Sequence, residues 1–249
     1  MATAPRARSP RGPATPLYSD EIRDKALLVN DRLCVEYGAP IPFFRSLDPL
    51  SELVGSMLSH RTRNSESGRA FRQLRERFPD WPAVRDAATS EVEAAIAPCT
   101  WPEQKAPRIQ AILRRIGELR DGDLSLDFLA GLPVTEARAW LESLPGVGPK
   151  TSAATLLFSK LRLPALPVDS HHHRVASRLG LIPAKLDVGP SHAVLEAQLP
   201  EGWSAQQVYD NHEALMLHGQ KICLPRGPRC GKCVVLDLCP FGQERMAQP

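Results

Sequence analysis

The sequence has no long hydrophobic run and little net charge, and both absences exclude classes of protein. No stretch of about eighteen consecutive apolar residues occurs in its 249 residues, so we expect no transmembrane helix. The 31 basic residues barely exceed the 28 acidic ones, which gives a net charge of +3. A surface that binds nucleic acid therefore has to come from local clusters of arginine and lysine.

The N-terminal segment lacks the apolar stretch of a secretory signal. It carries Arg6, Arg8 and Arg11 among several prolines. A segment of this composition has too few apolar side chains to form a core, which predicts a disordered basic tail over residues 1–16.

Strand-like alternation of apolar and polar residues is nearly absent from the chain. Apolar residues recur instead at the spacing of amphipathic helices, which predicts an all-α fold. Asp48, Asn64 or Ser65, and Thr135 are expected to cap helix N-termini. We expect helices over residues 20–37, 48–58, 64–78, 82–88, 90–97, 135–143, 170–179 and 204–218, one ending at 120, one from 149 and one from 191.

Cysteine is rare over most of the chain, but four of the six cysteines lie close together near its C-terminal end. Their spacing is C-x6-C-x2-C-x5-C, and this clustering favours metal ligation over a set of disulfides. Four thiolates in one short loop suit either a zinc ion or an iron–sulfur cluster, and ligand chemistry alone does not separate the two. The candidate ligands are Cys223, Cys230, Cys233 and Cys239.

The sequence Leu-Pro-Gly-Val-Gly-Pro-Lys at residues 144–150 predicts a tight hairpin between two helices. Gly146 and Gly148 tolerate positive φ, and Pro149 suits the first position of the helix that follows. The backbone N–H groups around Val147 would point outward at the positive end of a helix dipole. Such a site binds anions, so the hairpin predicts a contact with a phosphate backbone.

Lys150 ends this hairpin in the first turn of the expected helix, where the dipole disfavours a positive charge. Its pKa should therefore be lowered, and an amine that loses its proton readily can act as a nucleophile. The alternative role for Lys150 is a salt bridge to a phosphate. Asp169 begins another expected helix, and taken by itself it is expected to be an N-cap.

These features together resemble a known family. Residues 144–151, followed by Val-Asp-Ser-His at 168–171 and by Arg174, are similar to the core of the helix–hairpin–helix DNA glycosylases of the endonuclease III family. The resemblance extends over about residues 18–239. It implies that Lys150 is the nucleophile and Asp169 its acidic partner. The cysteine spacing matches the [4Fe–4S] loop of that family, so the resemblance implies this cluster as the cofactor.

The resemblance also implies how the helices group into two helical domains. A six-helix barrel carrying the hairpin would span residues 43–163. An iron–sulfur cluster domain would combine residues 17–42 with 164–249. The active site would lie in the cleft between the two domains, with Lys150 and Asp169 facing each other.

The activity that the resemblance implies is a bifunctional DNA glycosylase and AP lyase of base excision repair, which releases oxidised pyrimidines and cuts the strand by β-elimination. Its partner would be double-stranded DNA with damaged bases or abasic sites. We expect a cytoplasmic monomer associated with the nucleoid through DNA. Two alternatives remain: a mismatch uracil or thymine DNA glycosylase of the same superfamily, and a non-catalytic DNA-binding or redox-sensing iron–sulfur protein.

The sequence departs from the family pattern where a glutamine commonly fills the gap left by a flipped base. Arg61 takes that position, and Asn64 takes the position of the usual aspartate. Arginine can pair with an orphaned base or contact a phosphate. Trp101 aligns roughly with a second wedge residue, and its alternative role is in the core. Gln220 replaces the arginine that usually precedes the first cluster cysteine.

Further DNA contacts are expected from a histidine and from the basic residues of the cysteine loop. His171 looks like the histidine of the family motif. The run His171 to His173 also invites a metal interpretation, but adjacent residues on a helix point in different directions. The loop residues are expected to contact phosphates, with a solvated loop surface as the alternative; they are Lys221, Arg226, Arg229 and Lys232.

Overall fold

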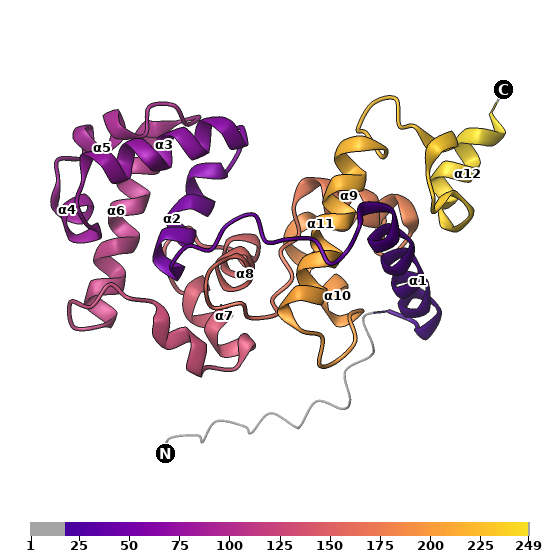
Figure 1. Ribbon diagram of the computed structural model, residues 1–249, viewed down its shortest axis with the longest axis horizontal. Helices are drawn as coiled ribbons and strands as arrows, with labels where there is room; N and C mark the ends of the chain where they lie inside the picture. Colours follow the sequence, from indigo (N-terminus) through magenta and orange to yellow (C-terminus); the bar gives the residue numbers. More distant parts are fainter. Residues whose placement is uncertain (1–17, 249) are drawn as a thin grey trace, which may run out of the picture.

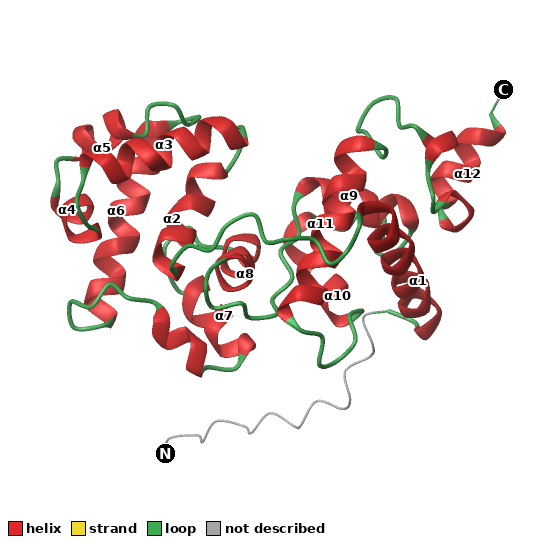
Figure 2. Cartoon of the chain, in the orientation of Figure 1, coloured by secondary structure: helices red, strands yellow, loops and turns green. Residues whose placement is uncertain are grey.

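The structure, a computed structural model, describes residues 18–248 and is helical throughout this range, with no strand among these residues (Figures 1 and 2). The all-α prediction is confirmed. The predicted basic tail over residues 1–16 lies outside the described part. The helices are α1 Asp20–Tyr37, α2 Pro49–Ser59, α3 Asn64–Arg77, α4 Trp81–Asp86, α5 Thr89–Ala95, α6 Pro102–Leu119, α7 Val134–Glu142, α8 Pro149–Phe158, α9 Ser170–Leu179, α10 Val188–Ala197, α11 Ala205–Lys221 and α12 Pro240–Ala247, with short 3-10 helices at Asp127–Gly131, Cys230–Lys232 and Leu236–Leu238.

The molecule has two hydrophobic cores, one in each lobe of the ribbon in Figure 1. The first core is built from α2 to α7, and the second from α1 and α9 to α11. Helix α8 belongs to both, because Leu156 packs in the first core whereas Leu157 and Phe158 pack in the second. All its residues from Thr151 to Phe158 are buried for that reason. The domain limits 43–163, 17–42 and 164–249 remain a prediction.

Two extended connections run between the lobes, one from α1 to α2 and one from α8 to α9 (Figure 1). The two connections form hydrogen bonds with each other. The N–H of Lys160 donates to the carbonyl of Leu47 at 2.8 Å, and the Arg162 guanidinium donates to the carbonyl of Arg45 at 2.9 Å. The two connections between the lobes are therefore fixed against each other although they are distant in sequence.

Most helix starts follow the sequence, but two predicted caps and one predicted start are wrong. Asp48 accepts a hydrogen bond from the N–H of Ser51 at 2.9 Å, as expected of an N-cap. Neither Asn64 nor Ser65 caps α3, because α3 already begins at Asn64 and is preceded by Arg63 without a side-chain cap. Thr135 is likewise wrong as a cap, because it lies inside α7. Helix α10 begins at Val188, one turn before the predicted start at residue 191, and α12 was not predicted.

Among the described residues, no helix combines the length and the apolar character that a bilayer crossing requires.

Candidate active site

The hairpin between α7 and α8 forms as the glycines predict, although only one of them uses positive φ. Gly146 has φ +77°, whereas Gly148 is extended with φ −110° and precedes Pro149 at the start of α8. The N–H of Val147 donates to the carbonyl of Leu144 at 3.2 Å, and the Val147 side chain is buried. The N–H groups of Gly146 and Gly148 make no backbone hydrogen bond in the described chain, so they can bind an anion.

Lys150 and Asp169 line one cleft between the two lobes, with a volume of about 880 Å³. Lys150 lies in the first turn of α8, and Asp169 directly precedes α9. Burial lowers the pKa of Lys150, an effect that the carboxylates of Asp169 and Glu52 oppose. The Lys150 side chain is half-buried and forms no hydrogen bond or ion pair with a described residue. Its amine is therefore accessible to a ligand in the cleft.

Asp169 is the N-cap of α9, as its position predicts. One of its oxygens, Oδ1, accepts from the N–H of His171 at 2.9 Å and from the N–H of His172 at 2.7 Å. Burial by itself would raise the pKa of Asp169, but neighbouring His212 and the N–H of His172 outweigh it, so the pKa lies below its usual value. Capping thus holds the carboxylate in place, and no hydrogen bond within the described residues engages its second oxygen.

A buried carboxylate beside Lys150 was not predicted from the sequence. Glu52 of α2 has 0 % of its side chain exposed and accepts two hydrogen bonds from Arg45, one of them at 2.8 Å from Nε. Burial raises the pKa of Glu52, and Arg45 counteracts this rise. The available signal was a glutamate on the apolar face of α2 between Leu50 and Leu53, where a charge is retained only if it is paired.

Arg61 and Trp101 lie together at the rim of the cleft, although 40 residues separate them in sequence. Both have positive φ, 51° and 55°, and the Arg61 guanidinium lies 5.8 Å from the centre of the Trp101 ring. Trp101 is 44 % exposed, which excludes the alternative of a core tryptophan. A non-glycine residue with positive φ stores strain and occurs often at ligand sites. Asn64 lines the same cleft.

Lys105 of α6 holds the two rim loops together and was also missed. It is only 6 % exposed, and its ammonium donates to the carbonyls of Leu58 and His60 at 2.7 and 2.8 Å and to Thr62 Oγ1 at 2.8 Å. Thr62 Oγ1 also accepts from the N–H of Thr100 at 3.1 Å. The lysine thereby satisfies carbonyl groups at the end of α2 that a helix leaves unpaired.

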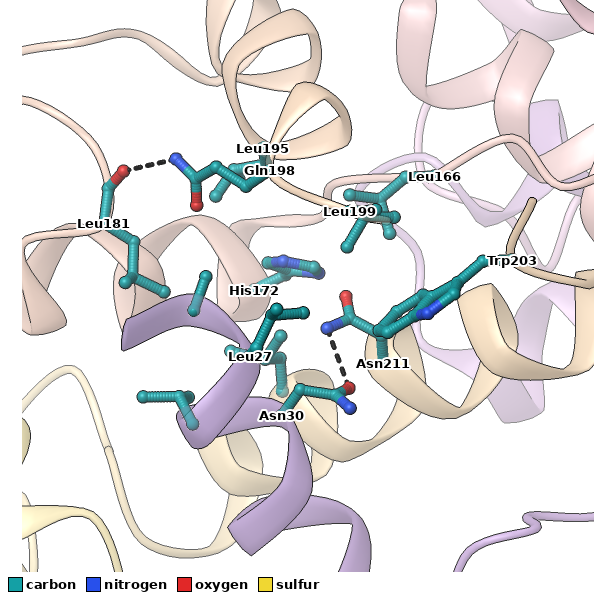
Figure 3. Close-up of a pocket in the computed structure, with 13 residues that line it drawn as sticks. Leu27, Asn30, Leu166, His172, Leu181, Leu195, Gln198, Leu199, Trp203 and Asn211 are labelled. Atoms are coloured by element: carbon teal, nitrogen blue, oxygen red, sulfur yellow. Dashed lines mark hydrogen bonds between the residues drawn. The ribbon is translucent and has the colours of Figure 1, made fainter. Parts of the chain in front are cut away.

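The three consecutive histidines point in different directions, as expected. His171 lines the cleft, while His173 Nε2 lies 2.7 Å from the carbonyl of Leu186. His172 faces away from the cleft into a cavity of about 20 Å³, where Figure 3 shows it beside Gln198 and Asn211. Within the described residues no group of three or more histidines, cysteines and carboxylates is placed to hold a metal ion.

Residues 54–205 match the family model described as HhH-GPD superfamily base excision DNA repair protein. Endonuclease III of Thermotoga maritima is 30 % identical over 202 residues, which cover 81 % of this chain and 87 % of that protein. The chain belongs to the endonuclease III family of the HhH-GPD superfamily. A putative DNA glycosylase of Arabidopsis thaliana is 36 % identical over 174 residues, 70 % of this chain but only 57 % of the plant protein.

Solved structures share the fold of this endonuclease III family member. A trapped covalent intermediate of endonuclease III with DNA superposes with a TM-score of 0.75 at 22 % identity, covering 90 % of this chain and 98 % of that one. A thermostable thymine-DNA glycosylase superposes with a TM-score of 0.73 at 21 % identity, covering 89 % and 98 %. At this identity the superpositions establish the fold and leave the choice of substrate open.

The four clustered cysteines, the candidate ligands of the family's iron–sulfur cluster, surround a second cavity of about 20 Å³. None of them forms a disulfide bond. They line one common cavity, which a cluster of several irons needs. Arg178 donates to the sulfur of Cys223, and the N–H of Gly242 to that of Cys239, both at 3.3 Å. Cationic and N–H donors suit thiolates, so the residues fit a cluster.

The basic residues of the cysteine loop, which were predicted to bind DNA, do not line the cleft. They are exposed and form no ion pair in the described chain, and the Lys221 ammonium lies 5.3 Å from the centre of the Tyr37 ring. Arg63 and Arg108, which were not predicted, line the cleft instead. The loop residues concerned are Lys221, Arg226, Arg229 and Lys232.

Proposed function

We propose that the protein is a bifunctional DNA glycosylase and AP lyase that releases oxidised pyrimidines. The proposal rests on the cleft that holds Lys150 and Asp169. A lysine whose pKa is lowered by burial shares one cleft with a carboxylate whose pKa lies below its usual value. This combination makes the amine easier to deprotonate, as a nucleophile requires, and keeps a negative charge in the same cleft.

DNA would bind across the mouth of the cleft through its phosphates. The free N–H groups of Gly146 and Gly148 and the guanidinium groups of Arg63 and Arg108 suit this role. The exposed residues of the cysteine loop would add phosphate contacts outside the cleft. These contacts position the duplex, so the affinity should fall steeply with salt.

Arg61 and Trp101 would enter the base stack when the damaged nucleotide flips out. Both side chains lie at the rim of the cleft, and the Arg61 guanidinium lies close to the Trp101 ring. The two side chains could therefore insert into the DNA together. The indole stacks on exposed bases, and the guanidinium pairs with the orphaned base. Flipping requires the least free energy where pairing is already weak, which favours damaged nucleotides.

The reaction begins with attack of the neutral Lys150 amine on C1′ of the flipped nucleotide. A bond forms between Nζ and C1′ while the bond from C1′ to the base breaks, and its electron pair leaves with the base. The Asp169 carboxylate stabilises the positive charge on the sugar and can take up the lysine proton. Opening of the sugar yields a Schiff base. Loss of a C2′ proton then expels the 3′ phosphate, which cuts the strand.

The cofactor that the four cysteines suit is a [4Fe–4S] cluster. Bound there, it would hold the loop of residues 223–239 in one conformation. Purified protein should absorb near 400 nm and contain iron. Stoichiometric zinc without iron would refute the assignment of Cys223, Cys230, Cys233 and Cys239 as ligands of an iron–sulfur cluster.

Borohydride trapping tests the proposed activity directly. A Schiff base is reduced to a stable amine, so the protein should become covalently linked to an abasic or thymine glycol duplex, and Lys150→Gln should abolish the product. A product that survives this substitution would exclude Lys150 as the nucleophile. Base release and nicking, scored separately on thymine glycol, dihydrouracil, uracil and mismatched duplexes, separate the proposal from a mismatch glycosylase. No activity on any duplex would favour a non-catalytic DNA-binding protein.

A further inference from the structure

His60 stands beside the candidate nucleophile and has no role in the mechanism described above. It follows the last turn of α2 and lines the cleft. Its ring nitrogen Nε2 lies 3.0 Å from the hydroxyl of Thr151, the residue that follows Lys150. The imidazole is therefore held one residue from the amine that would attack the sugar.

The hydrogen bond to Thr151 determines which nitrogen of the ring carries the proton. Thr151 is 2 % exposed, and His60 Nε2 is the only partner that its hydroxyl has within the described residues. A buried hydroxyl needs an acceptor for its proton, and Nε2 is the one available. Nε2 accepts, so the neutral ring carries its own proton on Nδ1.

The ring is neutral because of its surroundings. Burial lowers the pKa of His60 to about 4, and the positive charges of Lys150, Lys105 and Arg108 act in the same direction. At neutral pH the side chain is thus a hydrogen-bond donor without a positive charge. Nδ1 of His60 forms no hydrogen bond with a described residue. It is not completely buried, so it is open to the cleft.

The position of Lys150 restricts where the base of a flipped nucleotide can lie. The Lys150 amine has to reach C1′, and the base is bonded to C1′, so the base lies within the part of the cleft that His60 lines. The acceptor beside the glycosidic nitrogen is O2 in a pyrimidine and N3 in a purine. As the glycosidic bond breaks, negative charge develops on the base and spreads to this acceptor.

We propose that Nδ1–H of His60 donates a hydrogen bond to this acceptor and stabilises the departing base. The inference rests on the proposed glycosylase function and adds a catalytic residue to it. Because the donor is fixed before the base enters, it needs no reorganisation during the reaction. Its contribution is confined to base release, since an abasic substrate carries no base for it to contact.

Comparing two substrates tests the role of His60. Single-turnover base release from a thymine glycol duplex measures the step that needs the donor, and borohydride trapping on a preformed abasic duplex measures the step that does not. His60→Phe should slow base release about 100-fold and leave the trapping rate within about threefold. His60→Gln, whose amide can also donate, should recover most of base release.

The Thr151 hydrogen bond supplies a control that leaves the imidazole in place. Thr151→Ser keeps the hydroxyl and should match wild type, whereas Thr151→Val should slow base release alone, because Nδ1 is then no longer held as the donor. Thermal unfolding verifies that each variant folds. Equal losses on both substrates, or undiminished base release in His60→Phe, would overturn the proposal. Wild type that forms no adduct with abasic DNA would instead contradict the proposed function.

Discussion

Two lysines line the same cleft, and their surroundings differ in one decisive respect. Lys105, at the start of α6, donates three hydrogen bonds to oxygen atoms. Lys150, at the start of α8, forms none with a described residue. Burial lowers the pKa of both. Burial alone therefore does not identify a nucleophile: an ammonium with three acceptors is structural, and an amine without any is available for chemistry.

The largest expected effect comes from removing the negative charge that lies in the cleft with Lys150. Asp169→Asn should slow turnover about 1000-fold, because an amide does not stabilise a cationic sugar. DNA binding and the capping of α9 should persist, since asparagine also caps helices. Single-turnover kinetics and an equilibrium binding titration check both statements. Near-normal turnover would reduce Asp169 to its capping role.

The next largest effect is on stability and should distinguish the structural role of Lys105 from the role of Lys150. Lys105→Met should lower the free energy of unfolding by about 3 kcal/mol, because it removes the ammonium that donates to the carbonyls of Leu58 and His60 and to the Thr62 hydroxyl. Lys150→Met should change it by less than about 1 kcal/mol, because no hydrogen bond is lost. Urea denaturation of the two variants gives the comparison. Equal losses would contradict the structural role assigned to Lys105.

A smaller effect should come from the buried histidines behind Asp169. Burial lowers the pKa of His172 to about 3 and that of His212 to about 4, whereas an unfolded histidine titrates near 6.5. The unfolded state therefore binds more protons, so stability is complete above about pH 6.5 and is lost as the pH falls toward 4. Denaturation between pH 7 and 5 should show a loss of about 2 kcal/mol for each of the two histidines. In His172→Phe the dependence on pH should be shallower.

The smallest effect concerns the buried glutamate beside Lys150. The Glu52 carboxylate raises the pKa of Lys150 against the effect of burial. Glu52→Gln should therefore lower that pKa further and move the alkaline rise of the trapping rate to lower pH by less than about one unit. The matched variant Ser56→Ala, which removes only a 3.3 Å hydrogen bond to Glu52, should shift it less. A shift to higher pH would contradict this account.

The prediction from sequence succeeded where local chemistry is sufficient. Gly146, Pro149 and Asp169 each act on the backbone next to them, so the hairpin and the start of α9 could be predicted from a few adjacent residues. It failed at Thr135 and Asn64, where a residue suited to capping lies inside the helix. The reason is that several nearby positions satisfy the same local rule, and packing of the helix selects among them.

The side chains around Lys150 could not be predicted, because their partners are distant in sequence. His60 meets Thr151 across 91 residues, and Lys105 meets Leu58 across 47. A polar residue on an apolar helix face indicates that a partner exists and does not indicate which one. Glu52 and Lys105 both gave this signal.

The amino-acid sequence by itself determined the helical class, the glycine hairpin, the lysine and aspartate of the cleft and the spacing of the four cysteines. Each of these features depends only on residues that are neighbours in the chain. The tertiary structure decided that Lys150 and Asp169 share one cleft, that Arg61 meets Trp101, and that the basic cysteine loop lies outside the cleft. These outcomes depend on how two cores pack on either side of α8, and packing is a property of the whole chain.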